Sequence, residues 1–190
     1  MPLLSSSPLT LGTQMPSFTV DDVVKNQRLC SDDLPESQAT VVAFLCNHCP
    51  YVIHIRDPFT RFGNDNVARG VNVIAISSNS VKSHPMDGPL HMEHLAQELG
   101  WDFPYGFDET QEVAHAFKAC CTPEFFVFNQ AKALVYHGQF DSSRPGDGQP
   151  VTGSDLQAAV DALLNGETMS AVQTPSVGCS IKWNEPLEEA

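Results

Sequence analysis

The chain has 190 residues, of which 42% are hydrophobic and 17% are charged, and its net charge is −13. This size and composition predict a soluble globular protein, most simply one domain, and exclude a disordered chain. The negative charge argues against nucleic acid or an anionic membrane as a partner. No apolar run approaches the ~20 residues that a membrane-spanning helix needs.

The first residues do not resemble a secretory signal. Residues 1–8 have no basic start and no long apolar core. We therefore expect a cytoplasmic protein. In a reducing compartment the six cysteines are expected to be thiols or redox-active groups rather than a structural disulfide framework.

The hydrophobic pattern predicts strands that alternate with helices. An irregular lead-in at 1–17 precedes a short hairpin at 18–30 and a buried strand at 40–45. After Cys49 the apolar residues recur every three or four positions, which predicts a helix that Pro58 should kink or interrupt. The later predicted elements are a strand at 71–76, a long loop at 77–89, a helix at 90–99, a helix start at 108, strands at 125–128 and 133–140, a loop at 141–152 and a helix starting at 152 or 154.

This order of elements predicts the α/β fold class, with a central mixed β-sheet flanked by helices. The hairpin forms an N-terminal extension, and residues 166–190 form a C-terminal tail with few periodic signals. We assign residues 1–190 to a single domain whose core spans about 12–165. The loop at 77–89 follows a buried strand, and long loops of this kind are often functional.

The strongest functional signal is the pair Cys46 and Cys49, which follows the buried strand and opens the helix. At a helix amino terminus the free N–H groups and the helix dipole favour a thiolate, the form that attacks disulfides and peroxides. We expect Cys46 to be exposed and nucleophilic and Cys49 to resolve the mixed disulfide. The alternatives are a zinc half-site or two core thiols, although zinc usually requires a second similarly spaced pair.

Two further positions are expected to act on these thiols. His48 lies between the cysteines, where its ring can stabilise the Cys46 thiolate and lower the pKa of that thiol. Pro123 follows Thr122 at the entry to a predicted central strand, where proline cannot donate to the sheet. A cis peptide that turns the backbone toward the thiols would explain this proline, and a trans proline ending a loop is the alternative.

The arrangement strand, Cys-X-X-Cys-Pro, helix, strand, helix, Thr-Pro, hairpin, helix resembles the thioredoxin fold. A wider set of segments resembles the bacterial peroxiredoxin-like thioredoxin-family proteins of the alkyl hydroperoxide reductase and redoxin group, over about residues 10–184. The segments that carry this resemblance are Phe44 to Val52, Cys121 to Phe126, Arg144-Pro145, Pro150 to Gly153 and Pro175 to Trp183. The resemblance implies a cis Thr122-Pro123 bond beside the thiols, with both residues near the bound substrate.

Two positions depart from related families. Peroxiredoxins carry a Thr or Ser three residues before the peroxidatic cysteine, where this chain has Ala43. Thioredoxins carry a buried Asp six residues before the first cysteine, where this chain has Thr40, which cannot take up a proton at neutral pH. The Cys-X-His-Cys pattern resembles the oxidising DsbA-type dithiols more than thioredoxin, and a low Cys46 pKa would make the disulfide more oxidising.

Cys121 precedes the Thr-Pro pair and Cys179 lies in the tail. Each is either an accessory redox thiol or an inert buried thiol, and the two could pair with each other. We therefore predict a thiol–disulfide oxidoreductase that cycles Cys46 and Cys49 without a cofactor or a metal. Its partners would be a disulfide-containing protein, or a small thiol or peroxide substrate, and a dithiol reductant. The alternatives are a thiol peroxidase with Cys46 as its peroxidatic residue, and a metal-binding or metallochaperone module using Cys46 and Cys49.

Overall fold

The computed structural model describes residues 3–170 and 172–184. Its elements in chain order are β1 (Leu3–Ser5), β2 (Thr19–Asp22), β3 (Gln27–Cys30), η1 (Ser31–Asp33), β4 (Ala39–Phe44), α1 (Pro50–Ala68), β5 (Asn72–Ser77), η2 (Pro85–Asp87), α2 (Pro89–Leu99), β6 (Tyr105–Phe107), α3 (Glu112–Phe117), β7 (Cys121–Thr122), β8 (Glu124–Asn129), β9 (Leu134–Gly138), α4 (Ser154–Leu164) and β10 (Val177–Ser180). In these ranges no helix is both long enough and apolar enough to cross a membrane.

A seven-stranded sheet with the order β3-β2-β6-β5-β4-β8-β9 forms the centre of the fold. β4 pairs with β5, and β5 with β6, in parallel, whereas the other pairs of this sheet are antiparallel. The sheet is therefore mixed, as the sequence predicts. The predicted hairpin is confirmed as β2 and β3, which pair from Thr19↔Cys30 to Asp22↔Gln27.

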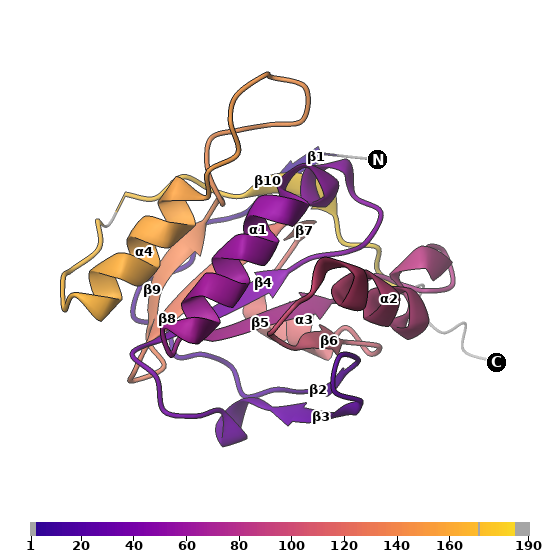
Figure 1. Cartoon of the computed structure of the whole chain (residues 1–190), viewed down its shortest axis with the longest axis horizontal. Helices are drawn as coiled ribbons and strands as arrows, with labels where there is room; N and C mark the ends of the chain where they lie inside the picture. Colours follow the sequence, from indigo (N-terminus) through magenta and orange to yellow (C-terminus); the bar gives the residue numbers. More distant parts are fainter. Residues whose placement is uncertain (1–2, 171, 185–190) are drawn as a thin grey trace.

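Helices cover both faces of this sheet (Figure 1). Alternate residues of β4 point to opposite sides, so Val41 and Ala43 join one core cluster while Val42 and Phe44 join the other. The first cluster includes the apolar faces of α1, α2 and α4, and the second includes α3 and part of the lead-in. Because all six residues of β4 are buried, this strand is the rigid centre from which the following turn emerges.

The sequence predicted that Pro58 would kink or interrupt the helix, and the interruption is wrong, because α1 runs continuously through Pro58. Pro58 removes one backbone N–H donor. However, Ile55, Phe59 and Phe62 are buried in the first core cluster on both sides of the proline. Packing of this apolar face holds the helix together across the missing hydrogen bond.

The lead-in and the tail also differ from their prediction as irregular segments. β1 and β10 pair in antiparallel fashion, and β10 pairs with β7, so the two ends of the chain form a second sheet of order β1-β10-β7. This sheet lies beside the amino-terminal end of α1 (Figure 1). The tail is therefore part of the structure around the predicted active site.

Candidate active site

The turn between β4 and α1 holds the two cysteines. Leu45 still donates its N–H to Ile76 at 2.8 Å, and Cys49 is the residue that directly precedes α1. Pro50 occupies the first helical position, where its missing N–H costs nothing. The prediction that Cys46 is exposed is wrong: Cys46 is 1% exposed and Cys49 is fully buried.

Thr122 contacts both sulfur atoms. Cys46 Sγ lies 3.3 Å from the Thr122 hydroxyl, and Cys49 Sγ lies 3.2 Å from the Thr122 carbonyl oxygen. The Thr122-Pro123 bond is cis, which confirms the prediction, and it lies beside the thiols as expected. The Thr122 segment therefore covers the cysteines, which is one reason why Cys46 is buried.

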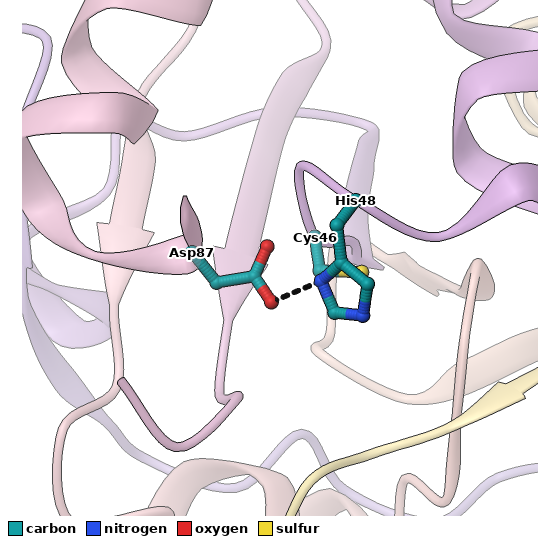
Figure 2. A group of neighbouring side chains, drawn as sticks. All are labelled: Cys46, His48 and Asp87. Atoms are coloured by element: carbon teal, nitrogen blue, oxygen red, sulfur yellow. Dashed lines mark hydrogen bonds and ion pairs between the residues drawn. The ribbon is translucent and has the colours of Figure 1, made fainter. Parts of the chain in front are cut away.

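His48 and Asp87 form a pair next to Cys46 (Figure 2). His48 Nδ1 lies 2.6 Å from a carboxylate oxygen of Asp87, and since an ionised carboxylate only accepts, Nδ1 is the protonated nitrogen. The Asp87 carboxylate also accepts from the Asn47 N–H at 2.8 Å and from the side-chain amide of Asn79 at 2.9 Å. Asp87 thus fixes both the turn and the His48 ring.

Sequence reasoning did not identify Asp87. It had marked the loop at 77–89 as functional, but nothing in the loop's pattern distinguishes Asp87 from its neighbours. Its burial in the short helix η2 provides the missing signal, because an acidic side chain that is wholly buried needs specific partners. His84 of the same loop stacks on the His48 ring at 4.5 Å between centroids.

Of the two active-site thiols, the one with the lowered pKa is Cys49 and not Cys46 as predicted. The pKa of Cys46 is raised well above that of an ordinary thiol, because its thiol donates a hydrogen bond to Cys49, because it is buried and because the Asp87 carboxylate lies near it. The same hydrogen bond lowers the pKa of Cys49 to about 5, and the contact with Cys179 acts in the same direction. The lower pKa of the pair therefore belongs to Cys49, and the lowered Cys46 pKa that the helix terminus and His48 predicted is not found.

Of the two accessory cysteines, only Cys179 lies at the site. Its sulfur is 2.7 Å from the sulfur of Cys49, and its residue pairs with Thr122 in the second sheet. Cys121 lies opposite Ser180 in that sheet, and its sulfur contacts the buried Glu124 at 3.6 Å. The neighbour of Cys179 is therefore Cys49 and not Cys121.

The site also contains three side chains of the kinds that bind metal ions. Cys46 Sγ, a ring nitrogen of His48 and a carboxylate oxygen of Asp87 lie within 4.8 Å of one another. Three protein ligands with one open position is the composition of catalytic zinc sites. These three residues differ from the pair of Cys46 and Cys49 that the sequence suggested for a metal module.

This fold and this pair of thiols define a thioredoxin-like protein of the thiol-based oxidoreductase class. The solved structure of a thiol:disulfide interchange protein of the thioredoxin family from Chlorobium tepidum TLS superposes with a TM-score of 0.62 at 18% identity, over 83% of this chain and 99% of that one. Residues 11–137 match the model of the AhpC/TSA family, and the chain belongs to that family.

Two solved structures are similar over nearly the whole chain. An uncharacterized conserved protein from Geobacillus kaustophilus is 45% identical, with a TM-score of 0.95 and coverage of 98% of both chains. A hypothetical protein from Sinorhizobium meliloti 1021 is 41% identical, with a TM-score of 0.93 and coverage of 96% of this chain and 99% of that one. A comparison with curated proteins gave no significant match.

Proposed function

We propose that this protein is a thiol–disulfide oxidoreductase that cycles Cys46 and Cys49 between dithiol and disulfide. The observation that carries the proposal is the contact of both sulfurs with one residue, Thr122, at 3.3 and 3.2 Å. Two thiols that lie on one turn and contact the same residue are well placed to form a disulfide with each other.

In the proposed cycle Cys46 attacks the substrate disulfide. Cys46 lies next to the His48–Asp87 pair, whereas Cys49 contacts the backbone of Thr122. His48 Nε2 is buried without a hydrogen-bond partner, so it is free to accept a proton. Transfer of the Cys46 proton to His48 Nε2 produces the nucleophile. Cys49, whose pKa is lowered, then attacks Cys46 Sγ as a thiolate and expels the second half of the substrate, which takes up a proton.

The proposed substrate is a disulfide-containing protein or a small disulfide, and a dithiol reductant restores the reduced pair. No cofactor is needed, because the electrons enter and leave through sulfur. The net step reduces one substrate disulfide to two thiols while Cys46 and Cys49 lose two electrons and form a bond.

A thiol peroxidase is the second candidate, and one contact favours it. The Thr122 hydroxyl lies 3.3 Å from Cys46 Sγ, so a hydroxyl reaches the sulfur from β7 although position 43 provides none. This hydroxyl could polarise a peroxide oxygen. We nevertheless expect peroxide turnover well below disulfide turnover, since Ala43 itself carries no hydroxyl to polarise the peroxide.

The test measures reduction of oxidised glutathione, with dithiothreitol as donor, and of hydrogen peroxide under the same conditions. Cys46→Ser and Cys49→Ser should each reduce disulfide turnover to background, and Cys49→Ser should trap a mixed disulfide at Cys46. The matched control is Cys30→Ser, because Cys30 lies on the edge strand β3. Full turnover in Cys46→Ser would overturn the proposal, peroxide turnover that exceeds disulfide turnover would favour the peroxidase, and stoichiometric zinc in the purified protein would favour the metal site.

A further inference from the structure

We infer that Cys179 is a second resolving cysteine, which takes over the disulfide from Cys46–Cys49 and forms a Cys49–Cys179 bond. The inference rests on the proposed dithiol function and extends it to a third thiol. Its main observation is the 2.7 Å between the sulfurs of Cys49 and Cys179, two residues that are 130 positions apart in the sequence. Both are buried, with Cys179 6% exposed, so the contact belongs to the interior of the protein.

The second sheet holds Cys179 in this position. Cys179 pairs with Thr122, the same residue that contacts both active-site sulfurs. Gly178 allows this close approach, because a Cβ atom there would lie 2.1 Å from the Thr122 carbonyl oxygen. Backbone pairing on one side and the absence of a side chain at Gly178 therefore place the third thiol against Cys49.

The exchange balances without an external oxidant. The Cys179 thiolate attacks Cys49 Sγ, the Cys49–Cys179 bond forms, and the Cys46–Cys49 bond breaks with its electron pair on Cys46. The proton that Cys179 gives up is matched by the one that the Cys46 thiolate gains. The protein keeps one disulfide throughout, and its two oxidising equivalents come from the substrate of the preceding step.

The electrostatics of the site make this exchange conditional on oxidation. In the reduced protein the pKa of Cys179 is raised to about 12, by burial and then by its hydrogen bond to Cys49 and the charge of Cys49. When Cys49 enters a disulfide it loses its charge, and two of these causes disappear. Lys182, which lowers the pKa of Cys179, remains. Cys179 therefore becomes a better nucleophile once Cys49 is held in any disulfide, either with Cys46 or with a substrate sulfur.

The chemical consequence is a different oxidised form. With a Cys46–Cys49 bond both active-site thiols are blocked, whereas a Cys49–Cys179 bond leaves Cys46 as a free thiol. Oxidised protein should thus still react at Cys46 with an alkylating reagent. This property distinguishes a three-thiol protein from one in which Cys179 only packs against Cys49.

The experiment oxidises the full-length protein with oxidised glutathione, quenches it in acid, alkylates the free thiols under denaturing conditions and maps the linked peptides by mass spectrometry. We expect Cys49–Cys179 peptides and alkylated Cys46 in the wild type. In Cys179→Ser we expect only Cys46–Cys49 peptides, with Cys46 alkylation reduced at least tenfold. Cys30→Ser is the control that should behave as the wild type.

A second variant keeps the test independent of how well Cys179→Ser folds. Cys46→Ser removes the first disulfide but leaves the other two thiols in contact, so it should still form Cys49–Cys179 on oxidation. Absence of this bond from both the wild type and Cys46→Ser would overturn the inference. If the wild type forms no Cys49–Cys179 bond but still reduces oxidised glutathione, the inference fails and the proposed dithiol function stands. If the wild type forms the bond but shows no turnover of oxidised glutathione, the proposed function fails.

Discussion

Replacing Asp87 by asparagine tests whether one buried charge organises the active-site turn. The side chain is fully buried and accepts hydrogen bonds from the Asn47 N–H, His48 Nδ1 and the Asn79 amide. Asparagine offers one acceptor oxygen and no charge, so at least one buried donor loses its acceptor. The change keeps the shape of the side chain, and its effect therefore reports on charge and hydrogen bonding.

The expected loss of stability follows from these hydrogen bonds. A hydrogen bond to a charged group contributes about 1.5–3 kcal/mol, and an orphaned buried donor costs about 1–3 kcal/mol. We expect Asp87→Asn to lower the free energy of unfolding by about 3 kcal/mol. For a protein of this size that corresponds to a fall in melting temperature of roughly 6–12 °C.

The same substitution should lower the pKa of Cys46. The Asp87 charge is one of the causes that raise this pKa, so its removal favours the thiolate. Thermal denaturation gives the first quantity, and the pH dependence of Cys46 alkylation gives the second. The control is Asp21→Asn, whose exposed pair with Arg28 at 3.3 Å should contribute less than about 1 kcal/mol. A melting temperature equal to that of the control, or a rise in the Cys46 pKa, would refute the reasoning.

His48→Leu is the complementary change. It leaves the Asp87 charge beside Cys46 without its partner at 2.6 Å. We expect the pKa of Cys46 to rise and disulfide exchange at neutral pH to slow, because the thiolate then faces an unpaired carboxylate and no base. An unchanged alkylation profile would show that His48 only fills space.

Gly178→Ala should move β10 away from Thr122, because the added Cβ would lie 2.1 Å from a backbone oxygen; we expect a loss of about 1–3 kcal/mol in denaturant unfolding and a lower yield of the second disulfide. Asp141→Asn should weaken the start of α4. Burial raises the pKa of Asp141, but hydrogen bonds from Ser143 and from the N–H groups of Thr152 and Gly153 lower it on balance. A lowered folded pKa means that the stabilisation is present above the unfolded pKa of ~3.9 and is lost as the pH falls through the folded one. The variant should therefore be about 1–2 kcal/mol less stable at pH 7 and approach the wild type in strong acid, as urea unfolding at several pH values would show.

The sequence predicted the elements whose signal is local. The buried runs that became β4, β5 and β8 and the spacing along α1 are properties of neighbouring residues. The adjacency of the cysteines and Thr122-Pro123 came from the family resemblance, since nothing local connects positions 76 residues apart. The sequence did not predict β10, because this strand has only four residues. Its buried residues are adjacent, so apolar and polar residues do not alternate along it.

The prediction of the thiol pKa values was wrong for a related reason. The prediction of a low Cys46 pKa considered the helix terminus and His48, which are close in sequence. The groups that raise this pKa are Asp87, from a distant loop, and Cys49, through a hydrogen bond whose direction the sequence does not reveal. Burial of Cys46 likewise depends on Thr122, which arrives from another part of the chain.

The position of β10 also affects the order in which a newly made chain can complete its active site. Cys179 follows Cys49 by 130 residues. At about 5–20 residues per second, a ribosome needs roughly 7–26 s to synthesise that interval. During this time Cys46 and Cys49 already exist in the nascent polypeptide, but β10, which pairs with Thr122 and contacts Cys49, does not. A growing chain that meets an oxidant can therefore close the proposed Cys46–Cys49 disulfide but not yet the proposed Cys49–Cys179 disulfide.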